Sequence, residues 1–131
     1  MLRFLFIALG GAIGTGLRYI VSSLDYKFSN GVFPISTLVV NLSGSLVIGF
    51  LWGLFERSAL SPTVRMFVFI GILGGFTTFS TFALEGFNLI RDGEFKIAFI
   101  NMIVSNLIGI VLVFVGFSLA RLLMAHMKGA A

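Results

Sequence analysis

The sequence predicts an all-α membrane protein with four transmembrane helices in a single domain over residues 1–131, and three observations support this prediction. First, 58% of the residues are hydrophobic and only 11% are charged, which is too little polar surface to cover a soluble domain. Second, four apolar segments reach the length of about 20 residues that a bilayer span needs. They lie at about 2–23, 35–55, 65–90 and 96–124. Third, the connections between them are short, polar and rich in helix-breaking residues.

The first segment, at about 2–23, begins like a secretory signal peptide: MLRFLFIALGGA has a basic residue, an apolar core and then small residues. The apolar run continues past Gly14 with no clear cleavage site, so we expect an uncleaved span. Every fourth residue shares a helix face, which here gives Gly10, Gly14 and Arg18. The glycines indicate close helix packing. Arg18 either reaches the lipid headgroups or lines a vestibule that concentrates anions.

The second segment, at about 35–55, carries a polar face. Every fourth residue along it gives Thr37, Asn41, Ser45, Gly49 and Gly53. Small and hydroxyl residues on one face are typical of packed membrane helices. An amide buried in lipid is costly and usually lies against protein or along an ion path, which makes Asn41 a candidate pore residue.

The third segment, at about 65–90, contains the unusual stretch GGFTTFSTF at 74–82. Glycine is a poor helix former, and Ser and Thr hydroxyls compete with backbone hydrogen bonds, so we expect a break near Gly74 and Gly75. A membrane helix tolerates a break only where it is buried in protein or faces a polar cavity. Carbonyls freed before the break would suit a small cation. Hydroxyls after the break could cap the second half-helix and donate to an anion.

Phe79 and Phe82 in the same stretch are three residues apart and lie along one helix face. The edge of an aromatic ring is electropositive, so ring edges could favour a small anion without a fixed cation that would hold it too tightly to pass. Simple packing is a strong alternative for any one of the 16 phenylalanines. The combination of rings, hydroxyls and glycines at mid-span favours an anion path.

The fourth segment, at about 96–124, carries Asn101, Ser105 and Gly109 at every fourth position. Asn101 is interpreted in the same way as Asn41. Asn106 lies off this face, and the sequence assigns it no role. Glu85 has no partner evident from the sequence and is expected to be structural.

No set of side chains indicates an enzyme, because the chain has no cysteine, one histidine, and no carboxylate pair or metal-ligand cluster at mid-span. The basic residues behind the net charge of +4 are scattered singly, which fits membrane lipid headgroups better than nucleic acid. Three alternative classes are a small dual-topology multidrug-type exporter, a small lipid kinase and a non-transporting structural protein. Exporters of this class resemble one another in having a carboxylate side chain within the first helix. Residues 2–23 of this chain contain no Asp or Glu. The five acidic residues are too dispersed for a kinase, and a structural protein needs neither the ring pair nor the mid-span hydroxyls.

Lysine and arginine give almost no bias in orientation. Five lie on the side of the N-terminus, namely Arg3, Arg57, Arg65, Arg121 and Lys128. Four lie on the other side, namely Arg18, Lys27, Arg91 and Lys96. Insertion in both orientations would explain this balance, and two copies would then form an antiparallel homodimer with its two-fold axis in the membrane plane.

Three motifs resemble the Fluc (CrcB) family of fluoride ion channels: GGFTTFSTF, TLVVN in the second segment and GGAIGTGLR in the first. The resemblance covers essentially the whole chain. It implies a passive fluoride-selective channel of the cell (inner) membrane, built as an antiparallel, dual-topology homodimer with two pores. It also implies a structural Na+ at the two-fold axis, held by the backbone carbonyls of Gly74 and Thr77.

The same resemblance implies a pore lined by two rings, one amide and three hydroxyls. These are Phe79, Phe82, Asn41, Ser80, Thr81 and Ser105. Arg18 matches the first-helix arginine of the family. Gly109 stands where some relatives have a further hydroxyl and Asn101 where some have an aromatic residue, so this end of the polar track departs from the family pattern.

Overall fold

The computed structural model describes residues 1–28, 32–56 and 60–129. Within these ranges it has four helical spans long and apolar enough to cross a membrane and contains no strand. The spans are Leu2–Ser23, Ile35–Phe55, Pro62–Arg91 and Phe95–Met127. The prediction of an all-α membrane protein with four spans is therefore confirmed. Arg57, used in the orientation count, lies outside the described residues.

The first two spans are single helices, whereas the third and fourth are composite. The single helices are α1 (Leu2–Phe28) and α2 (Ile35–Phe55). The third span consists of α3 (Pro62–Arg65), the π-helix η1 (Met66–Leu73), α4 (Gly74–Phe76) and, after a non-helical step, α5 (Phe79–Arg91). The fourth runs without interruption through α6 (Phe95–Ile103), the π-helix η2 (Val104–Ile108) and α7 (Gly109–Gly129).

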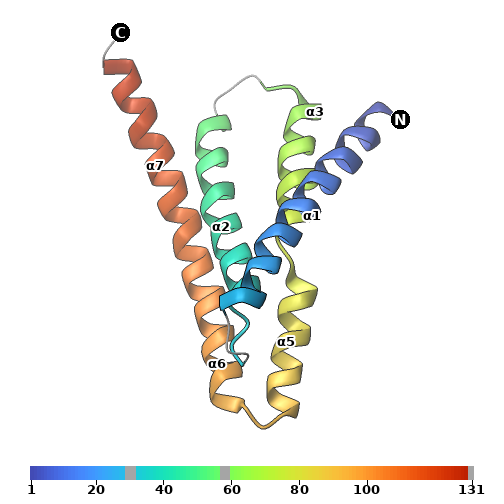
Figure 1. The fold of residues 1–131 in the computed structure, drawn as a ribbon. Helices are drawn as coiled ribbons and strands as arrows, with labels where there is room; N and C mark the ends of the chain where they lie inside the picture. The colour runs from blue at the N-terminus through green and yellow to red at the C-terminus, as the bar shows by residue number, and fades with distance from the viewer. Residues whose placement is uncertain (29–31, 57–59, 130–131) are drawn as a thin grey trace.

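The helices follow an up-and-down course, with the start of α1, the end of α2, α3 and the end of α7 at one end of the molecule (Figure 1). The turn between α5 and α6 lies at the other end. Gly93 in that turn has a φ of 85°, a left-handed conformation that glycine adopts without a steric penalty. At the opposite end Ser61 caps α3 by accepting from the Val64 N–H, and Pro62 occupies the first helical turn.

Glycines bring the spans into close backbone contact. A Cβ on Gly14 would overlap the carbonyl of Ile72, so α1 lies directly against the third span. A Cβ on Gly49 would overlap the carbonyl of Val113, so α2 packs just as closely on α7. The prediction that the small residues of the first two spans serve helix packing is confirmed.

The interior of a single chain is small. The largest fully buried side chains of the described residues are Val40 and Asn101. Large apolar side chains remain exposed along every span, among them Phe79 with 78% of its surface accessible. Such surface is stable when it faces lipid or another protein chain.

Candidate functional site

The third span is broken at Thr77 and Thr78. Thr77 has a ψ of 156°, and Thr78 has φ −146° and ψ 115°, so both are extended. The break was predicted, but its place near Gly74 and Gly75 was wrong: Gly74 is helical, with φ −65° and ψ −36°. Gly75 serves packing instead, since a Cβ there would lie 2.7 Å from the Gly11 carbonyl oxygen. Tertiary packing thus overrides the low helix propensity of glycine, and the chain breaks at the two threonines that follow.

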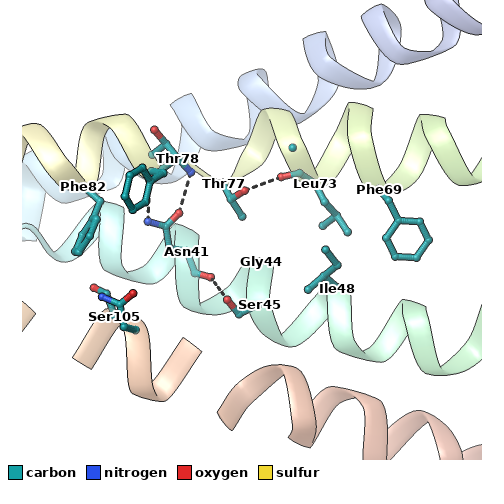
Figure 2. Close-up of a pocket in the computed structure, with 13 residues that line it drawn as sticks. Asn41, Gly44, Ser45, Ile48, Phe69, Leu73, Thr77, Thr78, Phe82 and Ser105 are labelled. Atoms are coloured by element: carbon teal, nitrogen blue, oxygen red, sulfur yellow. Dashed lines mark hydrogen bonds between the residues drawn. The ribbon is translucent and has the colours of Figure 1, made fainter. Parts of the chain in front are cut away.

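Asn41 of α2 bonds to the broken backbone through both the nitrogen and the oxygen of its side-chain amide. Its Nδ2 donates to the Thr78 carbonyl oxygen at 3.0 Å, and its Oδ1 accepts from the Thr78 N–H at 2.8 Å (Figure 2). These bonds replace helix partners that an extended residue cannot have, and buried backbone groups must find a partner. Nδ2 carries two hydrogens, so one donor of Asn41 is not needed for this bridge.

Thr78 also begins the second half-helix. Its Oγ1 accepts from the Thr81 N–H at 3.3 Å and donates to Thr81 Oγ1 at 2.9 Å. This is the geometry of an N-cap. The prediction that a hydroxyl caps the second half of the span is confirmed.

The diverted N–H groups release two carbonyls of the break. In a continuous helix the Thr78 N–H would donate to the Gly74 carbonyl, and the Thr81 N–H to the Thr77 carbonyl. Here Thr78 N–H donates to Asn41 Oδ1 and Thr81 N–H to Thr78 Oγ1. Gly74 and Thr77 thus lose their usual i+4 donors, which leaves their oxygens suited to a cation. No cluster of three His, Cys, Asp or Glu side chains that could hold a metal occurs in the described ranges.

A pocket of about 340 Å³ lies beside the break, between α2, the third span and η2. We call it the ring pocket, and its lining residues are Asn41, Gly44, Ser45, Ile48, Phe69, Leu73, Gly74, Thr77, Thr78, Phe79, Phe82, Ser105 and Asn106. None of these side chains is charged. In Figure 2, Phe82 and Ser105 lie at one end of the pocket, and Ile48 and Phe69 lie at the other.

Four predicted pore residues therefore meet at the ring pocket: Asn41, Phe79, Phe82 and Ser105. The rings of Phe79 and Phe82 have centroids 5.9 Å apart and planes inclined at 47°. Phe82 is half-buried, whereas Phe79 is largely exposed. The pocket wall formed by Phe79 is thus incomplete in a single chain.

Hydroxyls around the ring pocket donate to the protein itself in this structure. Ser45 Oγ donates to the Asn41 carbonyl at 2.8 Å, and Thr77 Oγ1 donates to the Leu73 carbonyl at 3.0 Å. Ser105 Oγ donates to Asn101 Oδ1 at 3.2 Å. A hydroxyl has one hydrogen, so each must rotate away from its present acceptor before it can donate to an anion.

Arg18 and Thr81 line a different pocket, of about 280 Å³, on the other side of the break. We call it the arginine pocket, and its lining residues are Thr15, Arg18, Tyr19, Ser22, Thr37, Val40, Thr78 and Thr81. Thr78 lines both pockets and separates them. Ser80 lines neither pocket and is exposed, so a single chain does not bring it to the other pore candidates.

The structure also shows the surroundings of three further polar residues, Glu85, Asn101 and Asn106. Glu85 accepts a hydrogen bond from Thr37 Oγ1 at 2.6 Å, which supplies the partner that the sequence did not show. Asn101 is only 1% exposed, and its Nδ2 has no hydrogen-bond acceptor among the described residues. Asn106 lines the ring pocket and donates to the Met102 carbonyl.

Sequence reasoning missed the Asn41–Thr78 bridge and the apolar half of the ring pocket, and it did not identify Thr78 as the capping residue. One signal was available: Thr37 and Asn41 share a face of α2, and both contact the third span. The apolar lining residues carry no such signal, because they do not differ from ordinary packing residues in the sequence.

Known proteins are similar to this chain over most of its length. Residues 5–117 match the family described as CrcB-like protein, Camphor Resistance (CrcB). A relative from Parabacteroides distasonis, named fluoride-specific ion channel FluC, is 41% identical over 128 residues, covering 98% of this chain and 100% of its own length. Proteins of the same name from Desulforapulum autotrophicum and Pyrococcus abyssi are 44% and 42% identical, covering 92% and 89% of this chain.

Proposed function

The chain belongs to the CrcB family, and from this premise we propose that it is a fluoride-selective channel whose anion path runs through the ring pocket. It is a multi-pass membrane protein and not an enzyme. Family membership favours a fluoride channel over a multidrug-type exporter, and residues 2–23 contain no carboxylate for such an exporter to protonate.

The observation that carries the anion path is the chemistry of the ring pocket. Amide and hydroxyl groups and two phenylalanine rings meet there with no charged side chain in the lining. Fluoride is small and strongly hydrated, so a pathway must replace water with several close donors. Neutral donors and ring edges bind an anion weakly enough for it to leave, whereas a fixed cation would trap it.

Efflux from liposomes tests the function. Vesicles loaded with fluoride or chloride and containing the purified protein should release fluoride far faster than chloride, with no need for a proton gradient. Protein-free vesicles are the control. Equal release of both anions, or fluoride release that requires a proton gradient, would contradict the proposal.

The functional unit in this proposal is an antiparallel homodimer with two pores. Phe79 and Gly74 border the ring pocket and are exposed, so a second chain would complete its wall. The nearly equal distribution of basic residues favours insertion in both orientations. A cysteine placed in the 56–62 connection should be labelled from both sides of the membrane in comparable amounts. Labelling from one side alone rules this assembly out.

A structural Na+ at the two-fold axis completes the proposed unit. The Gly74 and Thr77 carbonyls have lost their i+4 donors, and two from each chain would supply four oxygens. Four neutral oxygens are few for Ca²⁺, which takes 6–8, and fit a monovalent ion enclosed by protein. Protein prepared and assayed with N-methylglucamine in place of Na+ should lose fluoride flux and regain it when Na+ returns. Unchanged flux would remove the ion from the proposal.

A further inference from the structure

Besides the ring pocket and the arginine pocket, a groove of about 650 Å³ lies between α2 and α7. Ile48, Val113, Phe114 and Phe117 give it an apolar floor. Trp52 and Glu56 line its end near the C-terminus of α2. The groove therefore runs from the end of a membrane span, where headgroups lie, towards the apolar part of the bilayer.

One charged residue, Glu56, lines this groove, and two arginines outside its lining lie over rings that line it. Glu56 is exposed and makes no ion pair with any residue in the described ranges. Arg65 lies over the Trp52 ring, with its Cζ 5.6 Å from the ring centroid, and one guanidinium nitrogen donates to the Phe55 carbonyl at 2.6 Å. Arg121 lies over the Phe117 ring at 5.6 Å. Each guanidinium has five N–H donors, so most donors of Arg65 are not used by the Phe55 carbonyl.

We propose that this groove binds one phospholipid with a primary-ammonium headgroup, a phosphatidylethanolamine. An acyl chain would occupy the apolar floor, and the phosphate would accept from Arg65 and Arg121. The ammonium group would donate to the Glu56 carboxylate. Choline has no N–H to donate and phosphatidylglycerol has no cation for Glu56, so the charge pattern selects phosphatidylethanolamine among common phospholipids.

A phospholipid fits this groove better than a second copy of the chain. A pairing of two identical surfaces would have to match one exposed carboxylate and two guanidinium groups, whereas a zwitterionic headgroup complements them directly. The groove also ends at the headgroup level, while the proposed two-fold axis lies at the break in mid-span. Of the residues that line the groove, only Ile48 also lines the ring pocket, and no polar residue is shared. The lipid site therefore does not depend on the anion path.

Trp52 provides the measurement, because it is the only tryptophan in the chain and lines the groove. Full-length protein in detergent is titrated with phospholipids brominated on their acyl chains, which quench nearby tryptophan fluorescence. Dibrominated phosphatidylethanolamine should quench Trp52 saturably, at a concentration about tenfold lower than the choline or glycerol lipid, as expected for one charge-assisted hydrogen bond.

Two variants with matched controls separate headgroup recognition from simple apolar contact. Glu56→Gln should raise the half-quenching concentration of the ethanolamine lipid to that of the choline lipid, whereas Glu94→Gln, in the α5–α6 turn, should not. Val113→Phe should fill the groove and weaken quenching by all three lipids, whereas Val111→Phe, which lies outside the groove, should not. Glu56→Gln should keep its fluoride flux in vesicles without ethanolamine lipid, so the two proposals can fail independently.

Equal quenching by the ethanolamine and choline lipids would overturn the proposal, and so would quenching that does not saturate. If Val113→Phe altered self-association and left quenching unchanged, the groove would be an interface between copies and not a lipid site.

Discussion

Asn41 stabilises the broken backbone and lines the ring pocket at the same time. One amide hydrogen and the amide oxygen hold Thr78 in its extended conformation, and a second hydrogen is left for the pocket. An asparagine suits this position because it is both donor and acceptor without charge. An aspartate can accept from Thr78 but cannot donate to its carbonyl.

Asn41→Asp should therefore lower both stability and fluoride flux. Loss of a buried hydrogen bond costs about 1–3 kcal/mol, and a negative charge beside the pathway repels the anion. Thermal unfolding should shift to lower temperature and flux should fall by about tenfold or more. Asn88→Asp, on α5 and outside both pockets, should do neither. Normal flux in Asn41→Asp would remove Asn41 from the path.

Phe79 and Phe82 should contribute through their ring edges and not through bulk. Phe79→Ile and Phe82→Ile keep an apolar side chain and remove the edge, so flux should fall by roughly tenfold in each, the upper range for an aromatic contact. Size-exclusion chromatography should show unchanged assembly. Phe87→Ile changes an exposed ring of α5 that lines neither pocket. If all three variants conduct alike, the rings serve only packing.

At the scale of the element, the third span has its break because of hydrogen bonds that only the folded chain supplies. The sequence predicted that GGFTTFSTF interrupts a helix, since local propensity is visible in one segment. It could not place the break at Thr77 and Thr78, because Asn41 lies 37 residues from Thr78 in the chain. It also could not show that Gly75 packs directly against Gly11 and that Gly74 remains helical. Two π-helices left no mark in the sequence either: η1, which precedes the break in the third span, and η2, which carries Ser105 in the fourth span.

Thr78→Val tests the cap at the start of α5. Valine has the shape of threonine and cannot accept from the Thr81 N–H, so the variant should lose about 1 kcal/mol of stability, as typical for an N-cap. Flux should fall as well, because the same hydroxyl fixes the wall between the two pockets. Thr63→Val, in α3, is the matched control. A variant with unchanged melting temperature and unchanged flux would show that the cap does not hold the break.

At the scale of the whole molecule, one chain presents a small interior and a ring pocket with an exposed wall. The sequence predicted the four spans closely, because span length and hydropathy follow directly from the bilayer. It also identified four of the residues that line the ring pocket, namely Asn41, Phe79, Phe82 and Ser105, but not its apolar lining. Through family resemblance it placed Ser80 and Thr81 among the pore residues, whereas in one chain Thr81 lines the arginine pocket and Ser80 is exposed. Arg18, expected at the lipid headgroups or in a vestibule, lines the arginine pocket.

Charge added to one connection should disturb the proposed assembly. Three lysines inserted in the 56–62 connection would bias insertion to one orientation. Antiparallel partners would become scarce, and fluoride flux per protein should fall. Co-expression with a variant biased the other way, by lysines in the α5–α6 turn, should restore it. Full activity of either biased variant alone would contradict an antiparallel unit.

The reversal potential of the current in a planar bilayer tests passive fluoride selectivity most directly. With unequal fluoride on the two sides and opposing gradients of chloride, Na+ and protons, the current should reverse at the fluoride equilibrium potential. It should stay there when any of the other three gradients is removed. A reversal potential that moves with the proton gradient would indicate a coupled transporter, and one that moves with chloride or Na+ would indicate a pore that does not select fluoride.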